Sequence, residues 1–321
     1  MKIRIVLADI DEKYIDHFIR AFKIYYFNEV DIVTFSDSTA LKKYISSRAY
    51  DILLSVASLL PKEAEEKSMI LTSEMGIKEM NGRPAICKYQ KVENLYKGIL
   101  DTIAEQKSGI TYSYETSKES PVIAFTSAAG GVGKTTAALV YTRQLVKKGF
   151  QVMYLSLESF SNIDYFLNAE GSSNFSNVLF AVKCGKGNLQ MKIESSLKQT
   201  YGGVYFFSKP MNPNEIDELD QNEWNEFLDA VRAMGKFHCI VIDLPCANED
   251  TAKKIMPLSD RVLFITDGSD TTTEKTQTLM TCISKYDEVN GSDLSTKVSV
   301  IQNKCEGPRR EIGLPILAEL P

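Results

Sequence analysis

The segment that most constrains the fold is Val122–Gly149, in which an apolar run, a cluster of glycines and a helix-like pattern follow one another. Val122–Phe125 has the continuous apolar character of a strand that is covered on both faces. From Gly133 onward, apolar residues return at the spacing of a helix that packs on a sheet. The stretch Ala128–Thr136, AAGGVGKTT, joins these two elements. The order of strand, glycine-rich loop and helix predicts a phosphate-binding loop in an α/β domain.

The chemistry of this loop fits a nucleoside triphosphate. Glycines let main-chain N–H groups converge on phosphate oxygens, where the positive end of the following helix adds to the attraction. Lys134 is predicted to reach the β- and γ-phosphates, Thr135 to bind Mg²⁺ and Thr136 to contact the α-phosphate. The predicted nucleotide contacts are Gly130, Gly131, Val132, Gly133, Lys134, Thr135 and Thr136. The alternative is a glycine turn before an ordinary helix, which the flanking strand disfavours.

A second anchor for the metal is predicted at Asp243, the last residue of the apolar run Phe237–Asp243. Such a run is typical of a buried strand, and ligands gather at the carboxyl ends of strands in α/β sheets. Because carboxylate oxygens are preferred Mg²⁺ ligands, Asp243 is assigned to the magnesium site, directly or through water. The alternative is an Asp that caps the next helix, but its pairing with the phosphate loop favours the metal.

Residues 1–107 carry a separate alternation of strands and helices. The predicted strands are Ile3–Asp9, Val30–Phe35, Asp51–Ala57, Met69–Thr72 and Pro84–Cys87, and the predicted helices are Tyr14–Tyr25, Thr39–Ser47 and Val92–Ala104. This alternation indicates a flavodoxin-like sheet. The polar segment 108–120 is interpreted as a linker, and a second alternating series occupies 121–321. The expected fold class is therefore α/β, with two doubly wound parallel-sheet domains.

Composition narrows the functional classes. The chain has 321 residues, 44% hydrophobic and 25% charged, which is a normal globular balance. The net charge is −5, and its acidic excess lies beyond residue 107. Direct nucleic-acid binding is not expected, because phosphate contacts need clustered positive charge. The N-terminal residues have the pattern of a strand and not of a signal peptide. No run of apolar residues is as long as a membrane-spanning helix needs, so we expect a cytoplasmic protein without a transmembrane segment.

The glycine-rich loop and its surroundings resemble the MinD/ParA group of ATPases with a deviant Walker A motif. The resemblance covers about 121–321 and implies ATP and Mg²⁺ as ligands. Asp243-Leu244-Pro245 resembles the second Walker motif of the family. Asn303 and Lys304 resemble the residues that hold adenine, and Ile316–Pro321 resembles the strand and proline beside it. Members of the family usually continue with another helix, so the resemblance also implies a possible truncation at the C-terminus.

Two departures from the family pattern bear on hydrolysis. The signature lysine, which reaches the nucleotide of the partner subunit, is replaced by Ala129. A methyl group cannot stabilise charge that develops on the γ-phosphate. Arg143, Lys147 and Lys148 are candidates to replace it. Where many relatives have D-x-D after the next strand, this chain keeps only Glu158, which either positions the attacking water or is an ordinary surface residue. We expect at most a weak ATPase, with Lys134 and Glu158 as its catalytic residues.

The first domain resembles a degenerate response-regulator receiver. Asp9, Thr72 and Lys88 match its conserved pocket, but the phosphate-accepting Asp is missing near Ser55. A degenerate receiver before a MinD-like ATPase resembles the CpaE/TadZ proteins of Tad/Flp-type pilus assembly. The resemblance implies a homodimer that positions pilus or secretion machinery at the cell pole or inner membrane face, through protein partners. Two alternatives stay open: a ParA-like partition ATPase that acts on DNA, and a metabolic ligase of the same fold.

Overall fold

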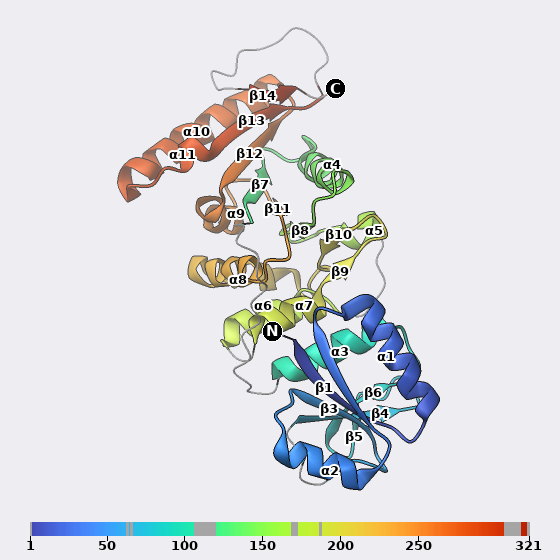
Figure 1. Cartoon of the computed structure of the whole chain (residues 1–321). Coiled ribbons are helices and arrows are strands. Elements are labelled where there is room, and N and C mark those ends of the chain that lie inside the picture. Colours follow the sequence, from blue (N-terminus) through green and yellow to red (C-terminus); the bar gives the residue numbers. More distant parts are fainter. Residues whose placement is uncertain are drawn as a thin grey trace. The chain divides into compact units, whose positions relative to one another are not determined.

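The computed structural model describes residues 2–61, 64, 67–105, 120–167, 173–185, 188–304 and 316–319. These residues form two compact units (Figure 1). The first unit contains the described residues up to 105 together with those from 185 to 195, and the second contains the rest. Each unit is built on a mostly parallel sheet with helices, which confirms the predicted α/β class. The predicted linker, 108–120, lies outside the described residues apart from Ser120.

The sheet of the first unit has the order β2-β1-β3-β4-β6-β5. Its parallel strands are β1 (Ile3–Ala8), β2 (Val30–Phe35), β3 (Ile52–Val56), β4 (Ser68–Thr72) and β6 (Arg83–Cys87). This is the flavodoxin-like order that the alternating pattern predicts. The short β5 (Glu79–Met80) pairs antiparallel with β6 and is absent from the sequence prediction, because two residues carry no periodicity.

Helices cover both faces of this sheet because alternate side chains of β1 point to opposite sides. Ile3, Ile5 and Leu7 pack with α1 (Glu12–Tyr26) and α3 (Val92–Glu105). Val6 and Ala8 pack on the other face with Leu41 of α2 (Ser38–Ser47). Asp11 starts α1 by accepting hydrogen bonds from the N–H groups of Lys13 and Tyr14.

The first unit also contains α7 (Leu189–Ser196), which lies far along the chain from its other elements. Met191 is only 2% exposed and belongs to the same apolar cluster as α1 and α3. Lys192 Nζ lies 2.6 Å from Asp101 Oδ1 on α3, and the Ser195 hydroxyl donates to the same oxygen. An apolar contact and an ion pair therefore fix α7 against α3.

The sheet of the second unit has the order β14-β13-β12-β7-β11-β8-β10-β9. Its strands are β7 (Val122–Thr126), β8 (Val152–Ser156), β9 (Lys198–Gln199), β10 (Val204–Phe206), β11 (Cys239–Asp243), β12 (Arg261–Thr266), β13 (Val298–Gln302) and β14 (Ile316–Glu319). β9 pairs antiparallel with β10, whereas the other pairs are parallel. The sheet is thus mixed at one edge rather than wholly parallel, and β7 lies between β11 and β12 in its interior.

The second unit also has helices on both faces of its sheet (Figure 1). The helices are α4 (Lys134–Lys147), α5 (Ile163–Leu167), α6 (Ser176–Cys184), α8 (Gln221–Ala233), α9 (Asp250–Ile255), α10 (Asp270–Asn290) and α11 (Leu294–Lys297). Asp220 and Glu223 form a capping box that starts α8, and Trp224 is fully buried. Among the described residues, no helix has the length and apolar character needed to cross a bilayer.

Candidate nucleotide-binding site

The loop between β7 and α4 has the backbone geometry that its glycines allow. Gly131 and Gly133 have φ angles of 78° and 97°, in the region that other residues rarely adopt. Gly133 is also tightly surrounded, because a Cβ atom there would collide with the side-chain amide of Asn303. The backbone conformation therefore requires glycine at this position, and a side chain there would also displace the amide of Asn303.

The predicted phosphate contacts lie along this loop and the first turn of α4. Val132 is buried and anchors the loop in the core, whereas Gly130 and Gly131 are exposed. Lys134, Thr135 and Thr136 form the first turn of α4, whose N–H groups have no partners within the helix. Together with the positive end of a 14-residue helix, these groups make a surface that suits phosphate oxygens.

Lys134 is paired with Glu158 across the site. Its Nζ atom lies 2.8 Å from Glu158 Oε1, with the lysine 8% and the glutamate 32% exposed. Burial acts to lower the pKa of Lys134, but the hydrogen bond and charge of Glu158 outweigh it, so the pKa lies above its usual value. Both predicted catalytic residues therefore meet at one place, and Lys134 is a cation in this arrangement.

Asp243 closes β11 at the same edge of the sheet. It is 1% exposed and lies in register with Phe125 of β7 and Ser156 of β8. The buried hydroxyl of Tyr154 donates to Asp243 Oδ2 at 3.0 Å. Sequence reasoning did not identify Tyr154, since its position in an apolar strand gives no signal beyond burial. The tyrosine therefore holds one oxygen of this carboxylate and leaves the other available.

The remaining oxygen, Asp243 Oδ1, is buried and has no partner of good hydrogen-bond geometry among the described residues, although the Thr135 hydroxyl lies close enough to lower the pKa of Asp243. Burial raises the pKa of Asp243 to about 6, although the nearby side chains of Thr135 and Tyr154 lower it. Leaving an acceptor unpaired inside a protein is costly. A hydroxyl and a free carboxylate oxygen at one place are the oxygen donors that Mg²⁺ uses. The residues present therefore fit a magnesium ion bound between Thr135 and Asp243.

Asn303 and Lys304 follow β13 and both contact the phosphate loop. Asn303 Nδ2 donates to the carbonyl of Val132, and Lys304 Nζ donates to the carbonyl of Gly131, each at 2.8 Å. The sequence predicts adenine contacts for both residues. The structure shows them bracing the main chain of the loop, and the amide oxygen of Asn303 is not used in this contact.

The candidates to replace the signature lysine lie at the other end of α4. Ala129 is half-buried and packs against the apolar core. The loop therefore presents no charged side chain at the position of the signature lysine. Arg143, Lys147 and Lys148 lie near the end of α4. A helix rises about 1.5 Å per residue, which separates Arg143 from Lys134 by roughly 13 Å along the axis. None of the three reaches the loop of its own chain from there.

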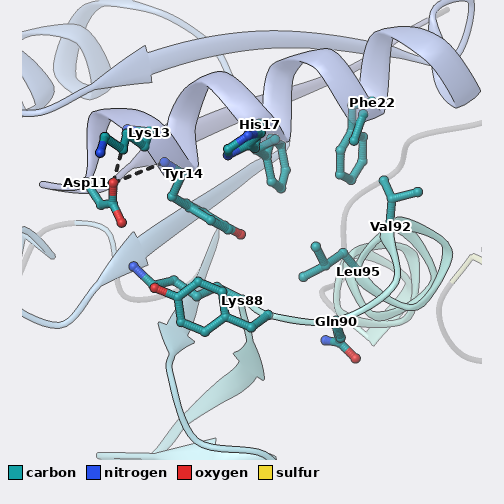
Figure 2. Close-up of a pocket in the computed structure, with 12 residues that line it drawn as sticks. Asp11, Lys13, Tyr14, His17, Phe22, Lys88, Gln90, Val92 and Leu95 are labelled. Atoms are coloured by element: carbon teal, nitrogen blue, oxygen red, sulfur yellow. Dashed lines mark hydrogen bonds between the residues drawn. The ribbon is translucent and has the colours of Figure 1, made fainter.

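The receiver-like pocket of the first unit keeps one ion pair of its pattern. Lys88 Nζ lies 2.9 Å from Asp9 Oδ2, and both side chains are buried. Ser55 occupies the position of the missing phosphate acceptor, and its hydroxyl donates to a main-chain carbonyl. Beside this pair, Tyr14 of α1 points into a cavity that Lys88, Gln90 and Leu95 line on the opposite side (Figure 2). A neutral serine cannot take the place of the acidic acceptor.

Comparison with known proteins agrees with both folds. Residues 1–104 match the family model described as a TadZ-like receiver domain, and residues 120–296 match an AAA domain model. No curated protein matches the chain in sequence.

Three solved structures illustrate the similarity of this chain to known folds. A ParA family ATPase from Chlorobium tepidum TLS is 15% identical, with 63% of this chain and 84% of that chain covered and a TM-score of 0.52. The ATP complex of a variant of McdA from Cyanothece is 14% identical, with coverages of 63% and 83% and a TM-score of 0.50. The Mg-ADP complex of MinD from Pyrococcus horikoshii OT3 is 18% identical, with coverages of 63% and 81% and a TM-score of 0.49.

Identities this low support the shared fold and no finer likeness. The AAA domain model, by contrast, covers more than half of the chain and includes the loop, Glu158 and Asp243. The receiver model covers the unit that contains the Asp9–Lys88 pair. The chain therefore belongs to the family that the AAA domain model describes, and it combines that domain with an N-terminal segment that matches the TadZ-like receiver domain.

Proposed function

We propose that this protein binds ATP with Mg²⁺ and uses the bound nucleotide to organise an assembly rather than to drive rapid hydrolysis. The observation that carries the proposal is the unpartnered, buried Asp243 Oδ1, which lies at the strand end beside Thr135 and the glycine loop. The Cyanothece McdA structure, which shares the fold, is an ATP complex.

Each residue of the site has a distinct task in this proposal. The loop N–H groups bind the phosphates, and Lys134 turns from Glu158 toward the β- and γ-phosphates. Thr135 and Asp243 hold Mg²⁺, which neutralises part of the phosphate charge when it is bound. Once Lys134 has moved, the carboxylate of Glu158 is free to accept a hydrogen bond from a water molecule. Asn303 and Lys304 keep the loop in place through its carbonyls.

Slow or absent turnover follows from Ala129. No cation from this position is available for the partner subunit, and Arg143 lies too far along α4 to serve its own loop. Electrostatic stabilisation of the transition state is usually the largest catalytic contribution, so its loss lowers the rate more than the affinity. ATP would then act mainly as a ligand that stabilises a homodimer.

The pilus assignment rests on the TadZ-like receiver domain. Since Ser55 cannot accept a phosphoryl group as an Asp does, we propose that this unit docks to proteins of the pilus or secretion machinery. The nucleotide-bound dimer would place that machinery at the cell pole or on the inner membrane face. A fluorescent fusion should form polar foci, and the Lys134→Ala form should be diffuse at equal expression.

Binding is tested by titration calorimetry of the full chain with ATP and MgCl₂. Charge-assisted hydrogen bonds contribute about 1.5–3 kcal/mol each, so Lys134→Ala should weaken binding by at least roughly 100-fold if two contacts are lost. Lys285→Ala is the matched control, because Lys285 is an exposed lysine on α10. Unchanged affinity in Lys134→Ala would contradict the assignment of the loop.

Turnover is measured on the same proteins as phosphate release with Mg-ATP. The organiser proposal predicts tight binding with almost no release. Clear release that disappears in Lys134→Ala would instead indicate a cycling ATPase with another basic group in place of Ala129. Salt-sensitive binding to DNA in the presence of ATP would support the partition ATPase and overturn the organiser.

A further inference from the structure

A cavity of the second unit lies away from the nucleotide site, beside the C-terminal half of α4. It has a volume of about 420 Å³ and opens between α4, α5 and the β9–β10 hairpin. Its walls include Arg143, Val146, Lys147, Phe166, Tyr201 and Val204. Cavities of this size accommodate small ligands or a few side chains of a partner.

Among the described residues that line this cavity, the charged side chains are both cations. Arg143 and Lys147 are exposed and make no ion pair or side-chain hydrogen bond with any part of the chain that the structure describes. None of the described residues that line the cavity is acidic. Arg232 of the same unit, by contrast, is paired with Asp260. Arg143 and Lys147 occur in the part of the chain that carries the acidic excess.

Aromatic side chains stand exposed on two walls. Tyr201, between β9 and β10, is 100% exposed, and Phe166 and its neighbour Tyr165 on α5 are 46% and 86% exposed. The Phe166 and Tyr165 rings form an edge contact with centroids 5.8 Å apart. Aromatic residues and arginine are the types enriched in the energetic centres of protein interfaces. Exposed rings beside unpaired cations therefore indicate a surface that a partner covers.

The walls are held in place before any partner arrives. Ile163 and Leu167 bury one side of α5 in the core of the unit. The hairpin is closed by the Val204 N–H, which donates to Thr200 Oγ1 at 3.1 Å, and a Cβ on Gly203 would lie 3.2 Å from Val146. A rigid cavity binds with a smaller ordering cost than one that must form on contact.

We propose that this cavity is a docking site for an acidic segment of a partner protein. A carboxylate of that segment lies between Arg143 and Lys147, and an adjacent large apolar side chain packs against Phe166 and Tyr201. Guanidinium–carboxylate pairs are short and directional, which selects Asp or Glu over a neutral residue at this place. Docking at this cavity depends on its walls alone and does not require ATP to bind at the glycine loop.

An anionic membrane is the other partner that basic and aromatic residues attract. The shape and charge of this unit favour an acidic peptide over a membrane as the partner. The cations flank a concavity rather than a protruding face, and the unit as a whole carries the acidic excess of the chain. Charges act over about 8 Å at physiological salt, so the two cations are felt by a group that enters the cavity and little by a distant surface.

The test selects a phage-displayed library of random peptides of about 12 residues on the immobilised full chain. Peptides with Asp or Glu next to a large apolar residue should be enriched. Synthetic fluorescent copies are then titrated by anisotropy against the Arg143→Glu/Lys147→Glu form and against the Lys275→Glu/Lys285→Glu control on α10. Affinity should fall by roughly 10- to 100-fold on the first form and stay unchanged on the control.

Two further variants make the result decisive. Peptides in which Lys replaces the acid should bind the Arg143→Glu/Lys147→Glu form better than the unmodified protein. Tyr201→Ser changes a fully exposed ring, so it should weaken binding without unfolding the chain. Selected peptides that lack acids, or that bind all forms equally, would overturn the proposal. Sedimentation with phosphatidylserine-containing vesicles that only Arg143→Glu/Lys147→Glu abolishes would overturn it in favour of a membrane.

Discussion

At the scale of single residues, the site depends on how one carboxylate is held. Asp243 is buried at the end of a strand, with one oxygen bound by Tyr154 and the other free. Burial and the charge of Asp243 raise the pKa of Tyr154 well above its usual value, so the tyrosine stays protonated and donates. The tyrosine thereby orients the free oxygen and lowers the pKa of Asp243.

Replacing Tyr154 by Phe should affect stability and metal use together. The change leaves a second oxygen of Asp243 unpaired in the core, which costs about 1–3 kcal/mol of unfolding free energy. It also raises the pKa of Asp243, because the hydrogen bond from Tyr154 lowers that pKa. Urea denaturation measures the first effect, and nucleotide binding at several Mg²⁺ concentrations measures the second.

The matched control for this substitution is Tyr286→Phe, which removes a hydroxyl from a tyrosine that is 41% exposed. It should leave both quantities within experimental error. If Tyr154→Phe lowered stability but did not change the dependence on Mg²⁺, the tyrosine would be a core residue only, and its role in positioning Asp243 would be rejected.

At the scale of elements, α7 shows how chain order and spatial order diverge. The helix lies between α6 and β9 in the sequence, yet its contacts place it in the first unit with α3. Met191 fills the apolar cluster, and Lys192 pairs with Asp101 at the surface. The partly exposed ion pair contributes little by itself, so the apolar contact carries most of the attachment.

Met191→Ala should therefore loosen the first unit selectively. Removing a buried methionine side chain costs about 2–5 kcal/mol when the cavity does not collapse. Hydrogen exchange should speed up for amides of α1 and α3, while those of α8 keep their protection. Met211→Ala is the control, since Met211 is 81% exposed. Equal exchange in both variants would show that α7 adds nothing to the core of this unit.

At the scale of the whole molecule, each unit has an apolar core of its own. The single tryptophan, Trp224, is buried in the second unit, so its fluorescence reports the unfolding of that unit alone. A ligand that binds only the folded second unit should stabilise that unit without acting directly on the first.

Mg-ATP should raise the melting temperature that Trp224 fluorescence reports. At a concentration 100 times Kd, binding adds about 2.7 kcal/mol, which corresponds to roughly 5–10 °C for a unit of this size. Hydrogen exchange in β1 and α3 should not change. Lys134→Ala serves as the control: with an affinity about 100-fold weaker it gains at most about 0.4 kcal/mol at the same ATP concentration, which is a shift of roughly 1–2 °C. An equal gain in the first unit would mean that the two units unfold as one cooperative block.

Much of the architecture could be predicted because it depends on local patterns. Apolar runs such as Phe237–Asp243 and the helical spacing after Gly133 report burial directly, and alternating elements lead to parallel sheets. The same patterns placed Asp243 at a strand end. They missed β5 and the antiparallel edge strand β9, because strands of two residues have no measurable period.

Sequence by itself determined the two α/β units, the glycine loop and the strand that ends in Asp243, since these follow from burial and from backbone conformations that only glycine adopts. Tertiary structure alone decided which side chains meet. Lys134 pairs with Glu158, Tyr154 holds Asp243, Asn303 braces Val132, and α7 packs with α3. These contacts join residues far apart in the chain, and their geometry depends on strand order and register, which no local pattern encodes.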